Sequence, residues 1–500
     1  GRLNLLKKRS SFLKIVRNDV RNVAIIAHVD HGKTTLVDEM LKQSGTFRDN
    51  QVVSERVMDS NDIEKERGIT IFSKQAVLNY KDVQIALLDT PGHVDFSAEA
   101  ERAITVLDYA ILVISASDGI QSHTRSLLKF LEFYKIPTFL FVNKMDLQKH
   151  NKTDIINSIN CEIGSGCIDF TNKDASFFEN IAMCREDLFD EYLNTKKISD
   201  DAIKKAILNR KIFPCFFGSA LKLEGVIELL DGIVDYTTQK NYPLDFGARV
   251  YKISEDEKGN RLTHLKITGG TLLVKELLND EKVNEIRIYS GKKYNCVPEV
   301  FPGDICAVTG INNSHSGKGY GIESSSSPTL SESIFTYSVK IINNVDIHFV
   351  LDALKKLEQE DPELHVDYKE DIQKINIQVM GKIHLEILKR ILEDRFSIIV
   401  EFEHGSIIYK ETIVDTVEGV GHYEPLKHYA EVHLLLEPGE KNSGITIKNK
   451  LSDDILSKNY QHQIISHIKE KTHLGVLTGS AIVDIKITLV NGKAHIKHTE

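Results

Sequence analysis

The sequence predicts a multidomain protein: an α/β P-loop domain, then a β-barrel, then two α+β domains. Length is the first observation, because 500 residues are too many for a single hydrophobic core. The second is that buried-strand runs alternate with helix-length stretches up to about residue 236, which indicates a doubly wound parallel sheet. The third is the pattern beyond residue 247, where short runs between glycine-bearing turns give way to amphipathic helices.

We expect domain boundaries at residues 1–18, 19–240, 245–330, 331–405 and 406–500. The first segment is basic and has no acid before Asp19, so we interpret it as a disordered leader, with an organelle transit peptide as the alternative. The last segment stops soon after a predicted returning strand, and we expect it to be a truncated domain.

The strands of the α/β domain are expected where apolar residues run together, at residues 23–26, 85–88, 110–114, 138–142 and 213–217. We expect a hairpin-free crossover between the loop after the first strand and Asp89. In the last domain, alternating residues 483–489 predict a strand, and Asn491-Gly492 predicts a two-residue hairpin turn into residues 494–496.

Composition excludes several classes of protein. Hydrophobic residues make up 41% of the chain, charged residues 27%, and the net charge is −9, which argues against a polybasic nucleic-acid binder. No run of 18 apolar residues occurs, so we expect no membrane partner. The six cysteines form no CxxC pair and indicate reduced thiols of a cytoplasmic protein.

A phosphate-binding loop is predicted directly after the first strand, where the sequence from Ala27 to Thr34 reads AHVDHGKT. Such a loop turns backbone N–H groups toward a β-phosphate at a helix N-terminus, where the dipole favours anions. Lys33 would span the β- and γ-phosphates, and the Thr34 hydroxyl would bind Mg²⁺. Ala27 stands where the general pattern has Gly, so the strand–loop–helix context is what supports the prediction.

Three further motifs end the later strands. Asp89 to Gly92 can hold a water on the Mg²⁺ and bring the backbone close to the γ-phosphate, although the same residues also suit a plain turn. Asn143-Lys144-Met145-Asp146 predicts guanine selection, because the Asp146 carboxylate can accept from N1–H and N2–H₂. Ser219-Ala220 would offer a backbone N–H to guanine O6. Together they place a nucleotide at the carboxyl ends of the strands.

The predicted nucleotide-binding residues come from these four motifs. They are Ala27, His28, Val29, Asp30, His31, Gly32, Lys33, Thr34, Thr35, Asp89, Gly92, Asn143, Lys144, Asp146, Ser219 and Ala220.

Residues 66–71 (ERGITI) together with residues 89–93 (DTPGH) resemble switch I and switch II of the translational GTPases in the elongation factor G superfamily. The resemblance implies a P-loop GTPase that hydrolyses GTP, with Thr34 and Thr70 as Mg²⁺ ligands. It also implies that His93 orients the attacking water, with Lys33 and Asp30 as the other catalytic residues and Asp30 near a monovalent cation. Val29 and Ile69 would form a hydrophobic gate.

Subfamily features are mixed. Residues 18–65 resemble the TypA/BipA GTPases, and residues 62–150 resemble the tetracycline ribosomal-protection proteins. Residues 381–386 (GKIHLE) and 475–480 (GVLTGS) are similar to domains III and IV of elongation factor G. A domain IV after domain III, and an intermediate insert between Asp146 and Gly218, favour the ribosomal-protection subfamily. Elongation factor G itself, a TypA/BipA-like GTPase and a non-hydrolysing GTP-dependent scaffold stay open.

The resemblance implies GTP and Mg²⁺ as cofactors and the ribosome, through its RNA and proteins, as partner. It also implies that domain V is absent from the truncated end. We further expect a monomeric, cytoplasmic protein whose output is either protection from antibiotic or translocation.

Overall fold

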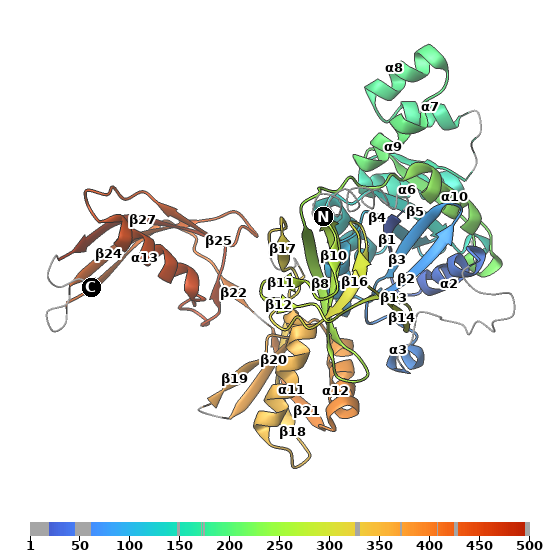
Figure 1. Cartoon of the computed structure of the whole chain (residues 1–500). Coiled ribbons are helices and arrows are strands. Elements are labelled where there is room, and N and C mark those ends of the chain that lie inside the picture. The colour runs from blue at the N-terminus through green and yellow to red at the C-terminus, as the bar shows by residue number, and fades with distance from the viewer. Residues whose placement is uncertain are drawn as a thin grey trace, which may run out of the picture. The chain divides into compact units, whose positions relative to one another are not determined.

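The computed structural model describes residues 20–45, 62–147, 151–171, 173, 176–325, 331–370, 373–407, 409–424 and 429–495 (Figure 1). The predicted leader, residues 1–18, lies outside the described residues. The chain divides into two compact units, one up to His404 apart from Ile334–Thr336, and one formed by Gly405–Glu500 with Ile334–Thr336. The predicted succession of α/β, β-rich and α+β modules is confirmed.

The N-terminal module is built on a seven-stranded sheet in the order β2-β3-β1-β4-β5-β7-β6. Its strands are β1 Val20–Ala27, β2 Lys74–Tyr80, β3 Val83–Asp89, β4 Tyr109–Ser115, β5 Thr138–Asn143, β6 Cys167–Asp169 and β7 Phe213–Phe217. All described pairings are parallel except β2 with β3. The central strands are buried on both faces, which explains their unbroken apolar runs.

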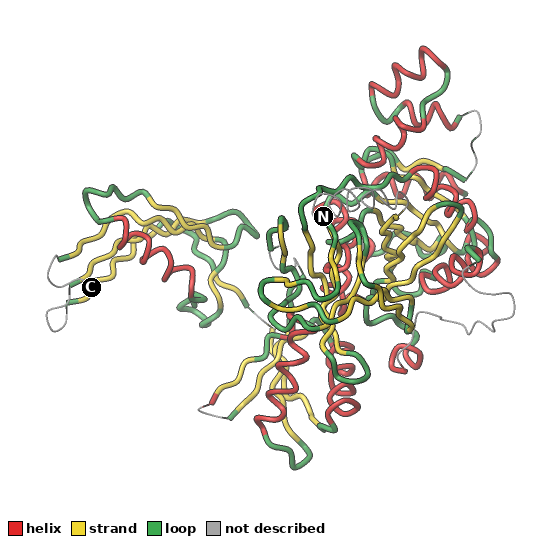
Figure 2. Tube along the Cα trace, viewed as in Figure 1, coloured by secondary structure: helices red, strands yellow, loops and turns green. Residues whose placement is uncertain are grey.

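Helices cover both faces of this sheet (Figure 2). They are α2 Lys33–Gln43, α3 Asp62–Arg67, α4 Ser97–Ile104, α5 Ser122–Phe133, α6 Lys152–Ile163, α7 Phe177–Ala182, α8 Glu186–Thr195, α9 Asp200–Leu208 and α10 Val226–Tyr236, with short 3₁₀ turns η1 Val94–Phe96, η2 Met145–Leu147 and η3 Ala220–Lys222. Alternate residues of β1 enter two separate cores: Ile25 packs with α2 and α10, whereas Ile26 packs with α4, α5 and α6. The two cores hold β1 rigidly, and the loop that follows it is therefore well positioned.

One sequence expectation about this module is wrong. The crossover from the first loop to Asp89 contains a hairpin, because β2 runs antiparallel to β3 with Lys74 opposite Asp89 and Tyr80 opposite Val83. Lys81 takes a positive φ of 53° in the tight turn between them. The hairpin was missed because polar residues interrupt β2, an edge strand with half-exposed positions.

The second module is antiparallel and β-rich. Its strands are β8 Gly247–Glu255, β9 Arg261–Gly269, β10 Leu272–Leu273, β11 Leu277–Leu278, β12 Glu281–Lys282, β13 Glu285–Ser290, β14 Lys293–Val297, β15 Glu299–Val300, β16 Ile305–Thr309 and β17 Gly319–Gly321. Six of them form a sheet in the order β14-β13-β16-β9-β8-β17. A buried ion pair joins this module to the first, with Lys266 Nζ 2.7 Å from Asp108 Oδ1. Asn22 Nδ2 donates to Asp108 Oδ2 and to the Gly303 carbonyl, both at 2.8 Å.

The third module packs two helices on a four-stranded sheet of order β19-β20-β18-β21. Its elements are β18 Phe335–Ile341, α11 Ile347–Glu360, η4 Pro362–Leu364, β19 Asp367–Lys369, β20 Lys374–Val379, α12 Lys382–Phe396 and β21 Val400–Ile407. The spacing of Val350, Leu351, Leu354 and Leu357 predicts one helical face; in α11 all but Leu351 are buried, together with Ala353.

The C-terminal unit has one helix beside a sheet of order β23-β24-β27-β25. Its elements are β22 Lys410–Glu411, β23 Val417–Tyr423, β24 Ala430–Pro438, β25 Ile445–Asn449, α13 Lys458–Glu470, β26 Ala481–Ile482 and β27 Ile485–Ala494. The hairpin predicted at Asn491-Gly492 is wrong: both residues continue β27, opposite His433 and Val432, beyond a register shift. Val490 is the extra residue at the register shift, and pairing with the long strand β24 continues beyond it through both residues. Ile496 lies outside the described residues.

Candidate functional site

The loop after β1 leads directly into the N-terminus of α2. Asp30 and Gly32 take positive φ angles of 63° and 84°, which turns the chain sharply before the helix. A Cβ at Gly32 would lie closer than 3.0 Å to Asn143 Nδ2, so only glycine fits. No described side chain caps this helix. Its first N–H groups and its dipole are therefore available to an anion.

A cavity of about 270 Å³ opens at this helix start. Its lining comes from the loop, from the segment after α3, from the turn after β3 and from the residue after β5. The lining residues are His28, Val29, Asp30, Gly32, Lys33, Thr34, Thr35, Gly68, Ile69, Thr70, Gly92, His93 and Lys144. The structure thus brings together residues that the sequence places in four separate motifs.

A buried lysine sits at the floor of the site. Lys33 Nζ donates to Thr70 Oγ1 at 3.1 Å and also bonds Asp89 Oδ1. Lys33 is 7% exposed and Asp89 is fully buried, so each charge compensates the other. Asp89 Oδ2 has no hydrogen-bond partner among the described residues, although it is buried. This carboxylate oxygen and the nearby hydroxyls of Thr34 and Thr70 are hard oxygen donors, which fit a Mg²⁺ ion.

The turn after β3 passes very close to the phosphate loop. A Cβ at Gly92 would lie 3.0 Å from the Ala27 carbonyl oxygen and 3.7 Å from the Val29 nitrogen. His93 follows at the cavity wall, with a side chain 25% exposed. Its Nδ1 accepts from the Asp95 N–H at 3.1 Å, so the neutral ring carries its proton on Nε2.

The two residues predicted as a hydrophobic gate both line this cavity. Ile69 also packs against the apolar cluster of Ile63, Ile71, Phe96 and Ile387. The position of Ile69 therefore depends on α12 as well as on the N-terminal module.

The end of β5 ties three loops together. Asn143 Nδ2 donates to the His31 carbonyl at 2.9 Å, and Asn143 Oδ1 accepts from the Ala220 N–H at 2.9 Å. Ser219 N–H donates to the Glu224 carbonyl at 3.1 Å. The sequence assigns a backbone N–H of Ser219-Ala220 to guanine O6, but both N–H groups of this pair are bonded within the protein, so a base would have to share or replace one of those bonds.

Asp146 lies beside the same loop. Hydrogen bonding from Ser219, with the charge of Lys222 Nζ at 3.5 Å from Oδ2, lowers the pKa of the Asp146 carboxyl. The carboxylate is therefore ionised at neutral pH and able to accept two hydrogen bonds. Lys144, at a positive φ of 61°, connects this loop to the cavity wall.

Histidines behind the phosphate loop include one that the sequence did not single out. The ring of His28 is edge-on to His31, with centroids 5.2 Å apart, and to His123, with centroids 5.7 Å apart. Burial lowers the pKa of His123 to about 4, and burial also lowers the pKa of His28 and His31. His31 Nδ1 lies 3.3 Å from the Val113 carbonyl oxygen, so its ring faces β4 instead of the cavity. His123 lies in the first turn of α5. The sequence alone would predict it to be a surface residue of an amphipathic helix, although it is buried.

Comparison with known families accounts for most of the chain. Residues 18–239 match the elongation factor Tu GTP binding domain, residues 330–404 match elongation factor G domain III, and residues 405–500 match elongation factor G domain IV. The chain is a translational GTPase of the elongation factor G family. It is accordingly a GTP hydrolase, and the cavity at α2 lies in its GTP-binding domain.

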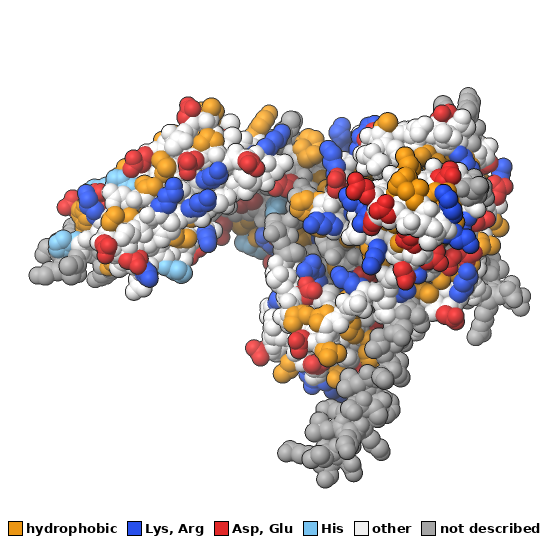
Figure 3. Space-filling model, turned by 90° about the horizontal axis from the view of Figure 1, so that it is seen from above, with side chains coloured by type: hydrophobic (Ala, Val, Ile, Leu, Met, Phe, Trp, Pro, Cys, Tyr) orange, Lys and Arg blue, Asp and Glu red, His pale blue; other side chains and the backbone are white. Residues whose placement is uncertain are grey.

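A solved structure from Thermus thermophilus has a similar fold, with a TM-score of 0.69 and 22% sequence identity, over 96% of this chain and 82% of that one. Among the described residues, no helix of this translational GTPase is long and apolar enough to cross a membrane. The face shown in Figure 3 mixes Lys and Arg with Asp and Glu. Its charges alone do not reveal a binding surface for RNA.

Proposed function

We propose that this GTPase hydrolyses GTP in response to the ribosome and uses the reaction to act there as a ribosomal-protection protein does. One observation carries the hydrolytic part: Lys33, Thr70 and His93 line a single cavity at the start of α2, and the buried Asp89 bonds Lys33. The subfamily rests on sequence, since a domain IV follows domain III and the insert between Asp146 and Gly218 is of intermediate size. Translocation, as by elongation factor G, is the second candidate for the output.

Phosphate binding follows from the charges. Lys33 would exchange its bonds to Asp89 and Thr70 for the β- and γ-phosphate oxygens, while the N–H groups of α2 bind the β-phosphate. Thr34 and Thr70 would hold Mg²⁺, with Asp89 acting through a bound water. The ion would neutralise charge on the transferring phosphate. Asp146 and Asn143 would select guanine.

Hydrolysis needs a positioned water more than it needs covalent chemistry. The His93 ring, which carries its proton on Nε2, would orient that water once it turns into the cavity. Val29 and Ile69 would restrict the approach until then, and the exposed Asp30 carboxylate would hold a monovalent cation at the rim. Loss of the γ-phosphate would then release the segment that carries Thr70 and change affinity for the ribosome.

Single-turnover GTP hydrolysis with and without ribosomes tests the enzymatic part. Wild type should release phosphate much faster with ribosomes, and His93→Ala should slow that stimulated release by about 10² to 10⁴ while GTP affinity stays within a few-fold. Release from the mutant at the wild-type rate would exclude His93 as the catalytic residue. Absence of ribosome stimulation in the wild type would favour the scaffold.

A second assay separates the outputs. Release of tetracycline from ribosomes by the wild type, without movement of tRNA and mRNA, supports ribosomal protection. Translocation in the same preparation would assign the protein to the elongation factor G activity instead.

A further inference from the structure

The start of α12 is closed by a residue from another module. Asp95 lies in η1, two residues after His93, and its Oδ2 accepts from the N–H groups of Ile383 at 2.9 Å and His384 at 3.2 Å. Gly381, the residue that precedes α12, has no side chain with which to cap the helix. The N-terminus of a domain III helix is therefore capped by Asp95, two residues after the switch II motif.

The glycine before α12 is required by this contact. A Cβ at Gly381 would lie closer than 3.0 Å to both carboxylate oxygens of Asp95. Its φ of −173° is ordinary extended backbone, so space and not backbone conformation limits this position. Glycine at position 381 therefore leaves the space that the Asp95 carboxylate occupies, although the two residues belong to different modules.

Asp95 also touches the proposed catalytic histidine. Its N–H donates to His93 Nδ1 at 3.1 Å, while its carboxylate holds α12. Phe96, the next residue, packs against Ile387 and has its ring centroid 5.7 Å from that of His384. Displacement of α12 would pull on the carboxylate and move, through one residue, the N–H that fixes the His93 ring.

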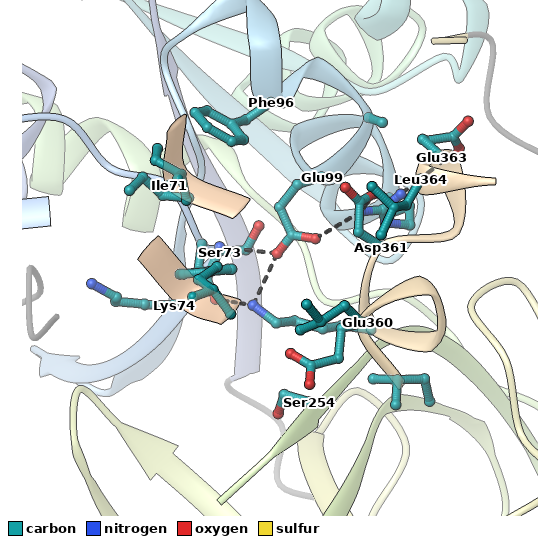
Figure 4. A pocket seen from close by; sticks show the side chains of 18 of the residues that line it. Ile71, Ser73, Lys74, Phe96, Glu99, Ser254, Glu360, Asp361, Glu363 and Leu364 are labelled. Atoms are coloured by element: carbon teal, nitrogen blue, oxygen red, sulfur yellow. Dashed lines mark hydrogen bonds and ion pairs between the residues drawn. The ribbon is translucent and has the colours of Figure 1, made fainter. Parts of the chain in front are cut away.

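Other contacts join the same modules without reaching His93. Asp361 accepts from Arg102 at 3.4 Å and pairs with His384 at 3.1 Å. Asp361 and Glu99, together with Asp95 and Phe96, line a cavity of about 400 Å³ (Figure 4). These ions hold domain III in place. Asp95 differs from them because it bonds both α12 and His93.

We propose that Asp95 is a positioning residue through which the docking of α12 sets the orientation of His93. A ribosome that displaces domain III would thereby change the rate of GTP hydrolysis. This inference rests on the proposed role of His93 as the group that orients water.

The test uses the full chain, saturating GTP and saturating ribosomes. Asp95→Ala and Gly381→Ala should each slow stimulated phosphate release by about 10- to 100-fold, since an error of about 1 Å in positioning has effects of this size. GTP affinity should stay within a few-fold in both. Because both changes break one contact, the double variant should be no slower than the slower single variant. Asp95→Asn keeps an oxygen acceptor and should recover most of the rate.

A matched control removes another carboxylate cap in domain III. Asp346 Oδ1 accepts from the His348 N–H at 2.7 Å at the start of α11. Asp346→Ala should cost similar helix stability but leave stimulated release unchanged. An equal slowing by Asp346→Ala and Asp95→Ala would overturn the inference, since both would then act through domain III stability.

His93→Ala separates the proposed catalytic role of His93 from the proposed positioning role of Asp95. If this variant releases phosphate at the wild-type rate, the proposed catalytic role of His93 fails. If it is slow while Asp95→Ala and Gly381→Ala both release phosphate at the wild-type rate, only the positioning role of Asp95 is overturned.

Discussion

The helices α2 and α12 each begin after a glycine, which has no side chain to act as a cap, and their N-termini are used in opposite ways. α2 follows Gly32 and opens onto a cavity, whereas α12 follows Gly381 and is closed by Asp95. Both ends present N–H groups that have no partner within the helix itself, and both have the same dipole. The open end can take a diffusible phosphate, and the closed end binds a carboxylate of its own chain.

The surroundings of the two ends differ in charge. Near α2 the rings of His28 and His123 are kept neutral, because burial lowers the pKa of each. Near α12 the groups are ions. Burial alone would raise the pKa of Asp361, but the hydrogen bond from His384 and the charge of Arg102 hold it well below its usual range. Lys33 and Asp89 carry charge at the open end and the neutral rings add none, whereas the ions around Asp361 hold a docked helix in place.

The largest effect is expected where the open end is blocked. In Gly32→Ala, the new Cβ would displace Asn143 Nδ2 and the residue would be strained at a φ of 84°. We expect GTP affinity to fall by about 10²-fold, or about 3 kcal/mol, as for a strained functional backbone position. Nucleotide titration measures the change.

Gly45, just beyond the other end of α2, supplies the control. Its φ of 72° gives the same kind of strain, but a Cβ there meets nothing within 4 Å. Gly45→Ala should lower stability and leave GTP affinity unchanged. Equal losses of affinity in the two variants would show that strain in α2, and not the blocked site, causes the effect.

The sequence predicted what is local and missed what depends on tertiary contact. The strands ending at Ala27, Asp89 and Asn143 were found because their apolar runs are continuous, and the motifs that follow them carry their own chemistry. β2 was missed because an edge strand needs few apolar residues. The local chemistry of Asn491-Gly492 predicts a turn, but tertiary pairing with His433 and Val432 of β24 makes both residues part of a strand.

The roles of Asp95 and His123 could not be read from the sequence. Asp95 is far along the chain from the helix that it caps, with Ile383 as its nearest partner in α12. The burial of His123 depends on its packing against His28. The roles of the site residues themselves stay predictions until nucleotide binding and hydrolysis are measured.

A smaller effect is expected when the pH is lowered far enough to protonate His123. The pKa of His123 is about 4 in the folded chain and 6.5 ordinarily, so the unfolded chain binds a proton first as pH falls. The free energy of unfolding is therefore unaffected by His123 above about pH 6.5, and it decreases as the pH falls toward 4. At pH 5 the loss is about 2 kcal/mol.

His123→Gln removes this proton site and should flatten the difference in urea-unfolding free energy between pH 7.5 and pH 5 by about that amount. Measuring both proteins at both pH values cancels the other titrating groups. Parallel pH dependences would show that His123 is not held neutral. The proposed difference in charge between the surroundings of the α2 and α12 N-termini would then be wrong.

The smallest effect is expected at the surface of the closed end. Arg390 of α12 pairs with Glu66 of α3, with one nitrogen–oxygen distance of 3.1 Å, and both side chains are exposed. Exposed pairs of this kind contribute little and are screened by salt. Arg390→Ala should therefore change ribosome-stimulated phosphate release by less than about twofold, and less still at high salt. A loss as large as that of Asp95→Ala would mean that surface charge between switch I and α12, and not the capped N-terminus, couples domain III to hydrolysis.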